Sequence, residues 1–358
     1  MRILVEITHP AHVHFFRNAI NIWKSHGHEV AVTARDKEIV IELLNLYGIK
    51  HTVLSGIGKG KLSLFSELIK RDCKLWRFCR KFKPDILTGI GAIFASHAGF
   101  VLRKPVIVWT DTDHAALINN LSLPFCNCIC TPESFSRDFG KKHIRYSGFH
   151  DLAYLHPKNF TPDKSVLNEL GISEGQKYII MRFVNWGASH DIGQKGLSEK
   201  MKKKAVEEFS KYAKVFISSE VPLDDYFEQY RINISPERMH HVLYCAWMYF
   251  GESGTMASES AVLGTPAVNI ATSAALIGVF KEMENAGLMF VRPNENEALA
   301  KGLELIKNEQ IKSQTQELAK KMLCNKINVA DFAAWFVENF PESERTLKKE
   351  PDYQYKFK

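Results

Sequence analysis

The stretch Gly251–Ile270, GESGTMASESAVLGTPAVNI, joins the end of an apolar run to a turn of small residues and then to a helical pattern. Phe250 ends a predicted buried strand, Ser253, Gly254 and Thr255 form the turn, and a helix begins in MASESAVLG. Free backbone amides and the positive end of the helix dipole make such a turn a binding site for an anion. The stretch therefore predicts a parallel α/β sheet with an anion site at one strand end.

Short apolar runs alternate with amphipathic segments on both sides of this stretch. The expected strands are Ile3–Ile7, Glu29–Thr33, Ile86–Thr88, Val106–Trp109, Asn127–Cys130, Tyr178–Phe183, Ala213–Ser218, His241–Tyr244, Met248–Phe250 and Ala267–Ile270. Such alternation is typical of parallel sheets covered by helices on both faces. Because Ser147–Ser165 is rich in Pro, His and Gly and interrupts the pattern, we expect two doubly wound Rossmann-like domains, 1–150 and 165–330. Residues 331–358 are expected to complete a last helix and to end in a loose, polar tail.

Length and composition fit this reading. A chain of 358 residues is long enough for two hydrophobic cores. The first residues predict a strand and no signal peptide, and no apolar run approaches the roughly 18 residues of a membrane span. Seven cysteines, an odd number, favour a reducing cytoplasm. Cys126, Cys128 and Cys130 alternate along one strand, where a metal site or, more simply, burial as small apolar residues explains them.

The net charge of +7 is concentrated in one segment. Lys59–Lys83 contains nine basic and two acidic residues, and its apolar residues recur at helical spacing from Leu62 to Trp76. An ordinary surface helix explains this pattern, and so does a helix that rests on an anionic membrane. Under the second reading, Lys70, Arg71, Lys74 and Arg77 face outward. No recognition motif accompanies the charge, so nucleic acid is not expected as a partner.

Residues that follow the predicted strands of the first domain are candidates for chemistry, because ligands of open α/β sheets bind at the carboxyl ends of the strands. In THPAHVHFF, a histidine near the start of a helix suits a general base, and His12 is the candidate, with His14 beside it. Histidines that merely solvate a loop are the alternative. In WTDTDHA, Asp111, Asp113 and His114 suit a proton, a sugar hydroxyl or a cation, although Asp113 also suits a helix N-cap.

The second domain offers a complementary set of candidates. Arg182 ends the strand Tyr178–Phe183 and is placed to bind phosphate. Glu259 lies just over one helical turn beyond Ser253–Thr255, where its carboxylate would accept hydrogen bonds from both ribose hydroxyls. His190 and Asp191 are further candidates for contact with a sugar or an acceptor. Diphosphate at the turn and ribose at the glutamate together describe a nucleoside diphosphate.

These motifs carry a resemblance that spans residues 1–330. The pattern SGxxxxE followed by LG and P resembles the donor half of glycosyltransferase-B enzymes and of UDP-N-acetylglucosamine 2-epimerases. AHVHFF, with His12 on the histidine of a His-Val loop, resembles the peptidoglycan N-acetylglucosaminyl transferase, as do DHAALINNLSL and the segment from Gly58 to Ser96, which includes that family's membrane-facing helix. The resemblance is greatest to an uncharacterised prokaryotic family related to both enzymes, in the motifs TDTDHA, MRFVNWGASHD and TMASESAVLGTPA.

The resemblance implies a glycosyltransferase-B fold, in which two Rossmann-like domains face a central cleft. It also implies a transferase that uses a UDP-sugar as substrate, with no cofactor and no metal. His12 or Asp113 would deprotonate the acceptor, and a lipid-linked acceptor would place a cytoplasmic protein on the inner face of the membrane. Two departures bear on this: Thr8, His9 and Pro10 replace the transferase's glycine cluster, and the spacing from Ser253 to Glu259 matches the epimerases better. A UDP-HexNAc 2-epimerase and a non-catalytic nucleotide-sugar binding protein are the alternatives.

Overall fold

The computed structural model describes residues 1–56, 61–113, 116–173, 175–184, 196–219, 222–271, 274 and 277–358, without the side chains of 61–67 and 116–117. The chain divides into two compact units, which are described separately. The first unit comprises residues 1–159 and 326–358, and the second comprises residues 160–325.

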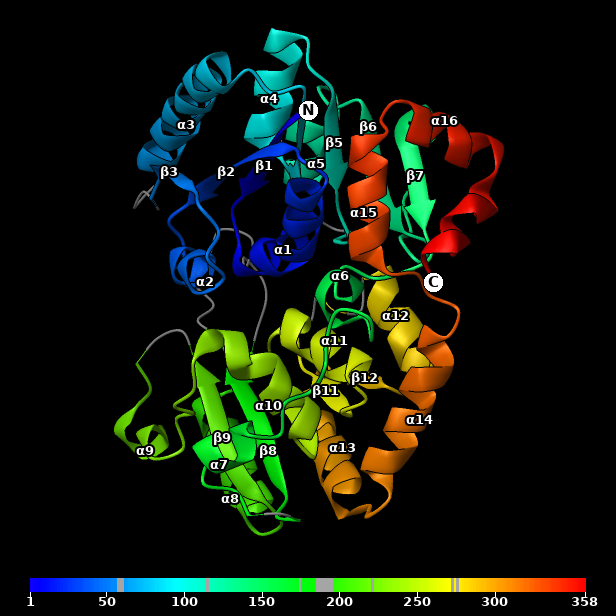
Figure 1. Cartoon of the computed structure of the whole chain (residues 1–358). Coiled ribbons are helices and arrows are strands. Elements are labelled where there is room, and N and C mark those ends of the chain that lie inside the picture. Colours follow the sequence, from blue (N-terminus) through cyan, green and yellow to red (C-terminus); the bar gives the residue numbers. More distant parts are fainter. Residues whose placement is uncertain are drawn as a thin grey trace. The chain divides into compact units, whose positions relative to one another are not determined.

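The first unit is built on a seven-stranded sheet in which every neighbouring pair is parallel (Figure 1). Its strands are β1 (Arg2–Ile7), β2 (Glu29–Arg35), β3 (Thr52–Ser55), β4 (Ile86–Ile90), β5 (Val106–Trp109), β6 (Cys128–Pro132) and β7 (His143–Tyr146). The order is β3-β2-β1-β4-β5-β6-β7, so the winding reverses between β1 and β4. Ligands of such sheets bind beyond the carboxyl ends of the strands, near this reversal.

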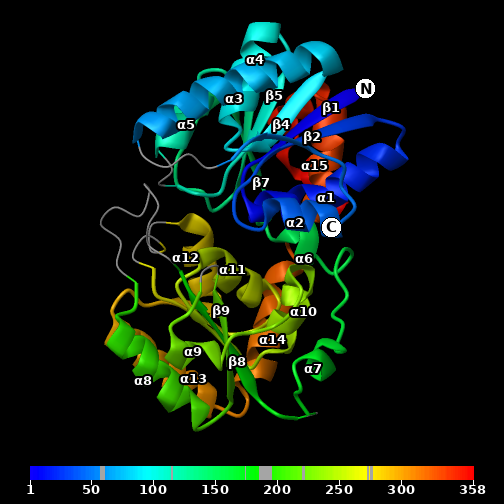
Figure 2. The ribbon, with the colours of Figure 1, turned by 90° about the vertical axis from the view of Figure 1, so that its left-hand side faces the viewer.

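Helices cover both faces of this sheet (Figures 1 and 2). They are α1 (Pro10–Ser25), α2 (Val40–Leu46), α3 (Lys61–Phe82), α4 (Ile93–Leu102), α5 (Ala116–Ser122), α6 (Leu152–Leu155), α15 (Val329–Glu338) and α16 (Glu342–Lys349), with 3₁₀ turns η1 (Gly140–Lys142) and η4 (Pro351–Phe357). α1 begins sharply because the His9 ring accepts a hydrogen bond from the Ala11 backbone amide at 3.2 Å and Pro10 occupies the first turn. The loop after β1 is therefore a capped helix start.

The second unit repeats the design on a smaller scale, with a five-stranded parallel sheet in the order β12-β11-β10-β8-β9. Its strands are β8 (Tyr178–Phe183), β9 (Lys214–Ser219), β10 (Met248–Gly251), β11 (Ala267–Asn269) and β12 (Met289–Val291). Its helices are α7 (Val166–Glu169), α8 (Glu199–Ser210), α9 (Asp225–Glu228), α10 (Met239–Cys245), α11 (Gly254–Val262), α12 (Gly278–Asn285), α13 (Glu295–Lys307) and α14 (Ile311–Leu323), with the 3₁₀ turn η2 (Pro236–Arg238). The winding reverses between β8 and β10, the strands that carry Arg182 and the start of the Gly251–Ile270 stretch.

The expectation of a loose C-terminal tail is wrong. Residues 326–358 return to the first unit, where α15 packs on α1 and the polar end of the chain folds into α16 and η4. Leu347 and Gln354 are buried, and the Gln354 side-chain oxygen accepts a hydrogen bond from the Ser147 amide at 2.7 Å. The composition of this segment predicts no packing, because its few buried residues stand among many charged ones.

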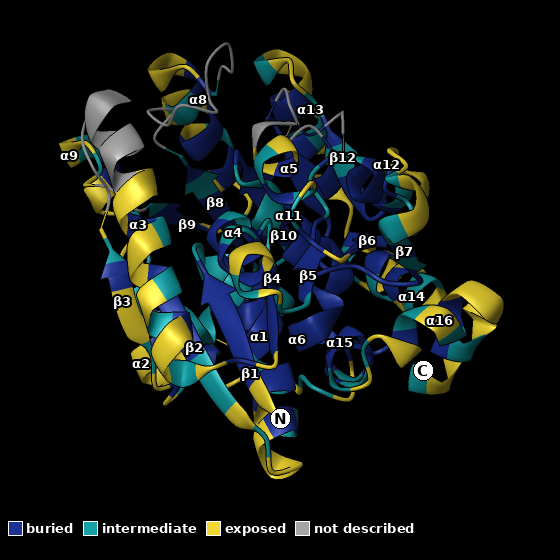
Figure 3. Cartoon of the chain, turned by 90° about the horizontal axis from the view of Figure 1, so that it is seen from above, coloured by how far each residue is buried: buried dark blue, intermediate teal, exposed yellow. Residues whose placement is uncertain are grey.

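Most of the basic segment Lys59–Lys83 forms α3 (Lys61–Phe82), whose described side chains are exposed along much of its outer side (Figure 3). The expectation that Arg71 faces outward is wrong: its side chain is 1% exposed and pairs with Glu6 of β1 at 3.2 Å. Lys70, Lys74 and Arg77 are exposed as expected. Ile69 is also 52% exposed, so the apolar stripe predicted through it is not part of the core in this stretch.

The main architectural prediction, two doubly wound Rossmann-like units with parallel sheets, is confirmed. One expected strand is wrong, because His241–Tyr244 lies inside the helix α10. The three alternating cysteines are buried, and burial raises the pKa of Cys126 to about 12. Within the described ranges, no three His, Cys, Asp or Glu side chains are grouped to hold a metal ion. No helix of this part of the chain has the length and apolarity that crossing a membrane requires.

Candidate functional site

The turn Ser253–Thr255 is the start of α11 and is rigidly fixed. The Ser253 hydroxyl accepts a hydrogen bond from the Met256 amide at 3.3 Å and so caps the helix. The Tyr249 hydroxyl accepts a hydrogen bond from the Ser253 amide at 3.2 Å and donates one to the Ser253 carbonyl at 3.1 Å. The first turn of α11 contains no acidic side chain, so the positive end of its dipole is not neutralised there.

Two glycines in this stretch are required by close packing. A Cβ atom on Gly251 would lie 2.7 Å from the Arg182 carbonyl oxygen of the neighbouring strand. A Cβ atom on Gly254 would lie 2.9 Å from the Phe280 ring of α12. The small residues of this turn thus allow β8, β10 and α12 to approach closely, and they leave the start of α11 partly exposed.

Arg182 lies beside this turn. It pairs in register with Gly251 on one side and with Ser218 of β9 on the other, and its guanidinium donates a hydrogen bond to the Ser218 hydroxyl at 2.9 Å. The sheet therefore places a cation next to the start of α11, at the strand pair where the winding reverses. A fixed cation and a helix start without acidic side chains in its first turn together favour a bound anion.

Glu259 is buried within α11, with 4% of its surface exposed. Its carboxylate lies 3.0 Å from Nε2 of His240, a residue of α10 that is equally buried. The sequence predicted the glutamate but not its partner. Because the two residues are 19 positions apart and on different helices, no local spacing in the sequence relates them.

Glu252 is a second carboxylate that the sequence analysis did not interpret. It is buried and accepts hydrogen bonds from the Val184 amide at 2.7 Å and the Leu197 amide at 2.6 Å. Glu252 thereby fixes both flanks of the segment 185–195. The predicted residues His190 and Asp191 belong to that segment and lie outside the described residues, as does His114.

In the first unit, Asp111 follows β5 and is paired with His150, which follows β7. The Asp111 carboxylate lies 3.1 Å from Nδ1 of His150 and accepts a hydrogen bond from the Thr112 hydroxyl at 3.1 Å. Burial alone would raise the pKa of Asp111, but the charge and hydrogen bond of His150 outweigh it, so the pKa is lowered. Asp111 is thus held as a carboxylate. His150 was not predicted, because it lies in the stretch interpreted as a domain break.

His12 lies at the same sheet edge, in the first turns of α1. Its Nδ1 accepts a hydrogen bond from the Thr8 backbone amide at 3.4 Å, and the Thr8 hydroxyl is 3.3 Å away. Burial, followed by the nearby charges of His9 and His150, holds the pKa of His12 well below its ordinary range. A neutral ring whose Nδ1 accepts carries its proton on Nε2, so this geometry favours His12 as a hydrogen-bond donor over the base predicted from sequence.

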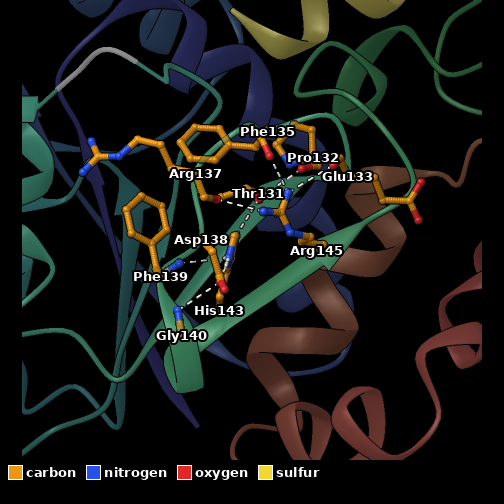
Figure 4. A network of polar contacts seen from close by, with 10 residues as sticks. All are labelled: Thr131, Pro132, Glu133, Phe135, Arg137, Asp138, Phe139, Gly140, His143 and Arg145. Carbon is orange, nitrogen blue, oxygen red and sulfur yellow. Dashed lines mark hydrogen bonds and ion pairs between the residues drawn. The ribbon is translucent and has the colours of Figure 1, made fainter.

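Asp113 is buried, and its carboxylate accepts hydrogen bonds from the amide and the hydroxyl of Ser136, at 2.6 and 2.5 Å. Ser136 belongs to the loop after β6, which Arg145 of β7 fixes by donating to the carbonyls of Glu133, Phe135 and Arg137 (Figure 4). These contacts give Asp113 a role in holding that loop.

His14 is buried on α1, and its Nδ1 lies 3.2 Å from the Tyr47 hydroxyl. Its ring also packs against Tyr154, with ring centroids 5.2 Å apart. These contacts place His14 in the packing between α1 and its neighbours. The candidates that the first unit brings together at one sheet edge are therefore His12, Asp111 and the unpredicted His150.

Comparison with solved structures identifies the class of fold. The chain is similar to a UDP-N-acetylglucosamine 2-epimerase, described as putative, from Listeria monocytogenes (14% identity, TM-score 0.68, 96% of this chain and 97% of that chain). It is also similar to the UDP-GlcNAc 2-epimerase of Neisseria meningitidis bound to UDP-GlcNAc (16%, 0.65, 97% and 100%) and to the spinosyn rhamnosyltransferase SpnG (13%, 0.62, 95% and 100%). Two Rossmann-like units with these likenesses define a glycosyltransferase-B fold.

Within this class, the chain belongs to the DUF354 family, described as proteins of unknown function, whose model matches residues 1–330. A relative in Methanocaldococcus jannaschii, the uncharacterized protein MJ0665, is 28% identical over 280 residues, which cover 75% of this chain and 81% of that protein. The predicted resemblance to an uncharacterised family is confirmed, and so is the predicted glycosyltransferase-B fold.

Proposed function

We propose that the protein is a glycosyltransferase that binds a UDP-sugar on its second unit. The observation that carries this proposal is the start of α11, which is capped and free of acidic side chains in its first turn and lies beside Arg182 where the sheet reverses its winding. Amides and a guanidinium are the groups that bind a diphosphate and stabilise it as it departs from the sugar.

The remaining roles follow the order of groups in a nucleoside diphosphate. The diphosphate lies on the amides of Gly254 and Thr255 and on Arg182, and the Glu259 carboxylate accepts hydrogen bonds from the ribose hydroxyls. His240, 3.0 Å from Glu259, orients that carboxylate. Uracil is the proposed base because a similar solved structure, the epimerase of Neisseria meningitidis, is bound to UDP-GlcNAc.

We also propose that the acceptor is lipid-linked and that the protein binds to the surface of an anionic membrane through α3. Ile69 is 52% exposed and Leu68 is 37% exposed, and the exposed cations Lys70, Lys74 and Arg77 follow on the same helix. Apolar side chains beside several cations are the combination by which a helix binds to an anionic bilayer surface.

The test is an incubation of the purified protein with a panel of UDP-hexoses and UDP-N-acetylhexosamines, first without an acceptor and then with lipid-linked sugars. Slow release of UDP without an acceptor, and faster release with one, supports the transferase. Interconversion of the sugar without an acceptor would identify an epimerase instead.

The diphosphate site is tested separately by calorimetry. Arg182→Met should weaken binding of UDP by roughly 10- to 100-fold and leave binding of uridine nearly unchanged, because a hydrogen bond to a charged group contributes about 1.5–3 kcal/mol. Ser218→Ala is the control, since it removes the partner of Arg182 on β9 but keeps the cation. Equal affinity of the wild type and Arg182→Met for UDP would refute the assignment.

A further inference from the structure

His97 of α4 is held between two groups that both accept hydrogen bonds. Its Nδ1 lies 3.1 Å from each carboxylate oxygen of Asp72 on α3, and its Nε2 lies 3.0 Å from the Leu121 carbonyl oxygen near the end of α5. An ionised carboxylate and a carbonyl have no proton to donate, so each ring nitrogen must carry one. The geometry therefore requires the doubly protonated, positively charged imidazolium.

The charges around the ring favour the same form. Asp72 faces it from α3, and Glu6 of β1, which is paired with Arg71, is the other carboxylate that acts on it. α4 contains no titratable residue besides His97, and α5 contains none. The hydrogen bond to Asp72 raises the pKa of His97 above its ordinary value of 6.5, and the charge of Asp72 and the Leu121 carbonyl add to this rise against the opposing effect of burial.

The His97 ring joins three helices of the first unit. α4 packs against both α3 and α5, and the three helices lie together on one side of the first sheet (Figure 2). The Leu121 carbonyl is one of the last four of α5, for which a helix has no donor of its own, and Nε2 of His97 donates to it. Just beyond α5, the Phe125 ring packs edge-on against the imidazole with centroids 5.1 Å apart. Because the His97 side chain is 28% exposed, its proton can exchange with water.

We propose that His97 is a proton-sensitive clamp, which ties α5 to α3 as an imidazolium and releases α5 when it loses one proton. A neutral ring keeps a single N–H. Because an ionised carboxylate is a stronger acceptor than a carbonyl, the remaining proton stays on Nδ1, bonded to Asp72. Nε2 then presents a lone pair to the Leu121 oxygen, and two acceptors face each other without a proton. The bond to α3 survives and the bond to α5 is lost.

The clamp is complete at acidic pH and opens as the pH rises. Because the pKa of His97 is raised in the folded protein, its stabilisation is fully present below 6.5, the ordinary value, and is lost as the pH rises through the higher value of the folded protein. α5 is the first helix after Asp111 and Asp113 in the chain, so the clamp acts close in the sequence to two candidate residues of the site.

Nitrogen-15 NMR of histidine-labelled protein tests the protonation of the ring, and the His97 signals are identified by their loss in His97→Gln. The midpoint of the titration should lie above 6.5, with the proton leaving Nε2 while Nδ1 keeps its own. Asp72→Asn should move the midpoint to lower pH, because the carboxylate that favours the imidazolium is removed. A midpoint below 6.5 in the wild type, or loss of the proton from Nδ1 first, would overturn the proposal.

Hydrogen exchange measures the release of α5. After correction for the intrinsic effect of pH on exchange, protection of the amides at the end of α5 should fall by roughly 3- to 10-fold as His97 titrates, which corresponds to one hydrogen bond. The Leu123 amide, which donates to the Asn119 carbonyl at 2.9 Å, is one of them. Amides of α1 are the internal control and should show no such change.

Two variants separate the clamp from other effects of pH. In His97→Gln the side chain is neutral at every pH, so the change in α5 protection should disappear. His26→Gln is the matched control and should behave as the wild type, because the His26 ring is 54% exposed and pairs with Glu338, away from these helices. Protection of α5 that stays constant while His97 titrates in the wild type, or that changes equally in His97→Gln, would overturn the clamp.

Discussion

Glu259 and His240 face each other inside the second unit, and neither has more than 4% of its surface exposed. A buried carboxylate beside an imidazole is expensive to desolvate, and such pairs are often retained for function. In the proposed donor site, the carboxylate is fixed in place to accept the two hydroxyls of a ribose. This role of Glu259 in ribose binding can be tested by substitution.

The prediction is that Glu259→Gln weakens binding of UDP by roughly 10- to 100-fold, because each charge-assisted hydrogen bond contributes about 1.5–3 kcal/mol. The measurement is calorimetry with UDP and with its 2′,3′-dideoxy analogue. Wild-type protein should prefer UDP, and the preference should disappear in the variant. Glu295→Gln, on α13 of the same unit, is the control. A variant that still discriminates between the two nucleotides would show that Glu259 does not contact the ribose.

Lys312 of α14 is a buried lysine whose effect on the pH dependence of stability can be measured. Its ammonium donates a hydrogen bond to the Tyr244 carbonyl at 2.6 Å and another to the Thr265 hydroxyl, and burial lowers its pKa from 10.5 to about 7. Between pH 7 and 10.5 the unfolded chain therefore binds more protons at this group than the folded chain does. The free energy of unfolding should rise with pH across this window, by up to about 1.4 kcal/mol per pH unit from Lys312.

Lys312→Met should remove this part of the pH dependence. Urea denaturation of both proteins at pH 7.5 and 9.5 measures this effect. The free energy of unfolding should increase more between the two pH values in the wild type than in the variant. Lys320→Met is the control, because Lys320 is on the same helix but 74% exposed. Equal gains in the wild type and Lys312→Met would contradict a buried lysine with a lowered pKa.

The residues that sequence reasoning identified are those whose role follows from a neighbouring motif. Arg182 and Ser253–Thr255 follow strands, so the rule for open sheets predicts their edge of the sheet without a structure. His150 could not be found in this way, because its meaning depends on Asp111, which is 39 positions earlier in the chain. His240 depends in the same way on Glu259.

Among the helices, α3 shows that hydrophobic periodicity predicts a helix but not the direction of every charged side chain. The spacing predicted a helix, and the helix is there, but its charged residues do not all face water. Arg71 turns inward to Glu6 and packs over the Phe94 ring, 4.5 Å from the centroid. A cation is buried here because a carboxylate on β1 requires one, and that carboxylate is 65 residues away in the sequence.

If α3 binds anionic membranes as proposed, neutralising its exposed cations should weaken that binding. Replacing Lys70, Lys74 and Arg77 with Gln removes three charges, each worth about 1 kcal/mol near an acidic surface, so vesicle affinity should fall by roughly 100-fold. Sedimentation with vesicles of acidic and of neutral lipid measures this, and wild-type binding should weaken with added salt.

The matched control replaces Lys200, Lys203 and Lys204 of α8, three cations of the second unit, with Gln. Arg71 is left intact, because removing one member of a buried pair costs about 3–5 kcal/mol and would confuse unfolding with lost binding. Equal binding of the wild type to neutral and acidic vesicles would show that α3 is not a membrane-binding surface. Wild-type binding by the α3 variant would show the same.

The element in which sequence reasoning failed is α10. His241–Tyr244 was expected to be a strand, but Met239–Cys245 is a short helix. A run of four apolar or aromatic residues does not distinguish the two, because periodicity needs a longer window than the run provides. The packing of His240 on Glu259 and of Val242 in the core decides the outcome.

At the scale of the whole molecule, the chain leaves the first unit after residue 159 and returns at residue 326. The alternation of strands and helices was sufficient to predict two doubly wound units. It was not sufficient to predict the return, because α15, α16 and η4 add no strand. Trp23 of α1 shows how the return is fixed: its indole donates a hydrogen bond to the Ala334 carbonyl of α15 at 3.1 Å.

Deleting residues 341–358 should therefore destabilise the first unit. The deletion exposes the surface that Leu347 covers and leaves the Ser147 amide without the Gln354 oxygen. We expect a loss of about 2–5 kcal/mol in the free energy of unfolding, comparable with removing a large buried side chain. Thermal denaturation measures the effect, and the control deletes only Lys358. An unchanged melting temperature in the longer deletion would mean that residues 341–358 do not stabilise the first unit.

The proposed donor site requires the start of α11 to bind the diphosphate of UDP. A crystal structure of the protein grown with UDP is the decisive test. We expect the diphosphate on the amides of Gly254 and Thr255 with Arg182 beside it, and the ribose hydroxyls on Glu259. Clear density for UDP at any other place, or no UDP at a concentration that saturates binding in solution, would contradict it.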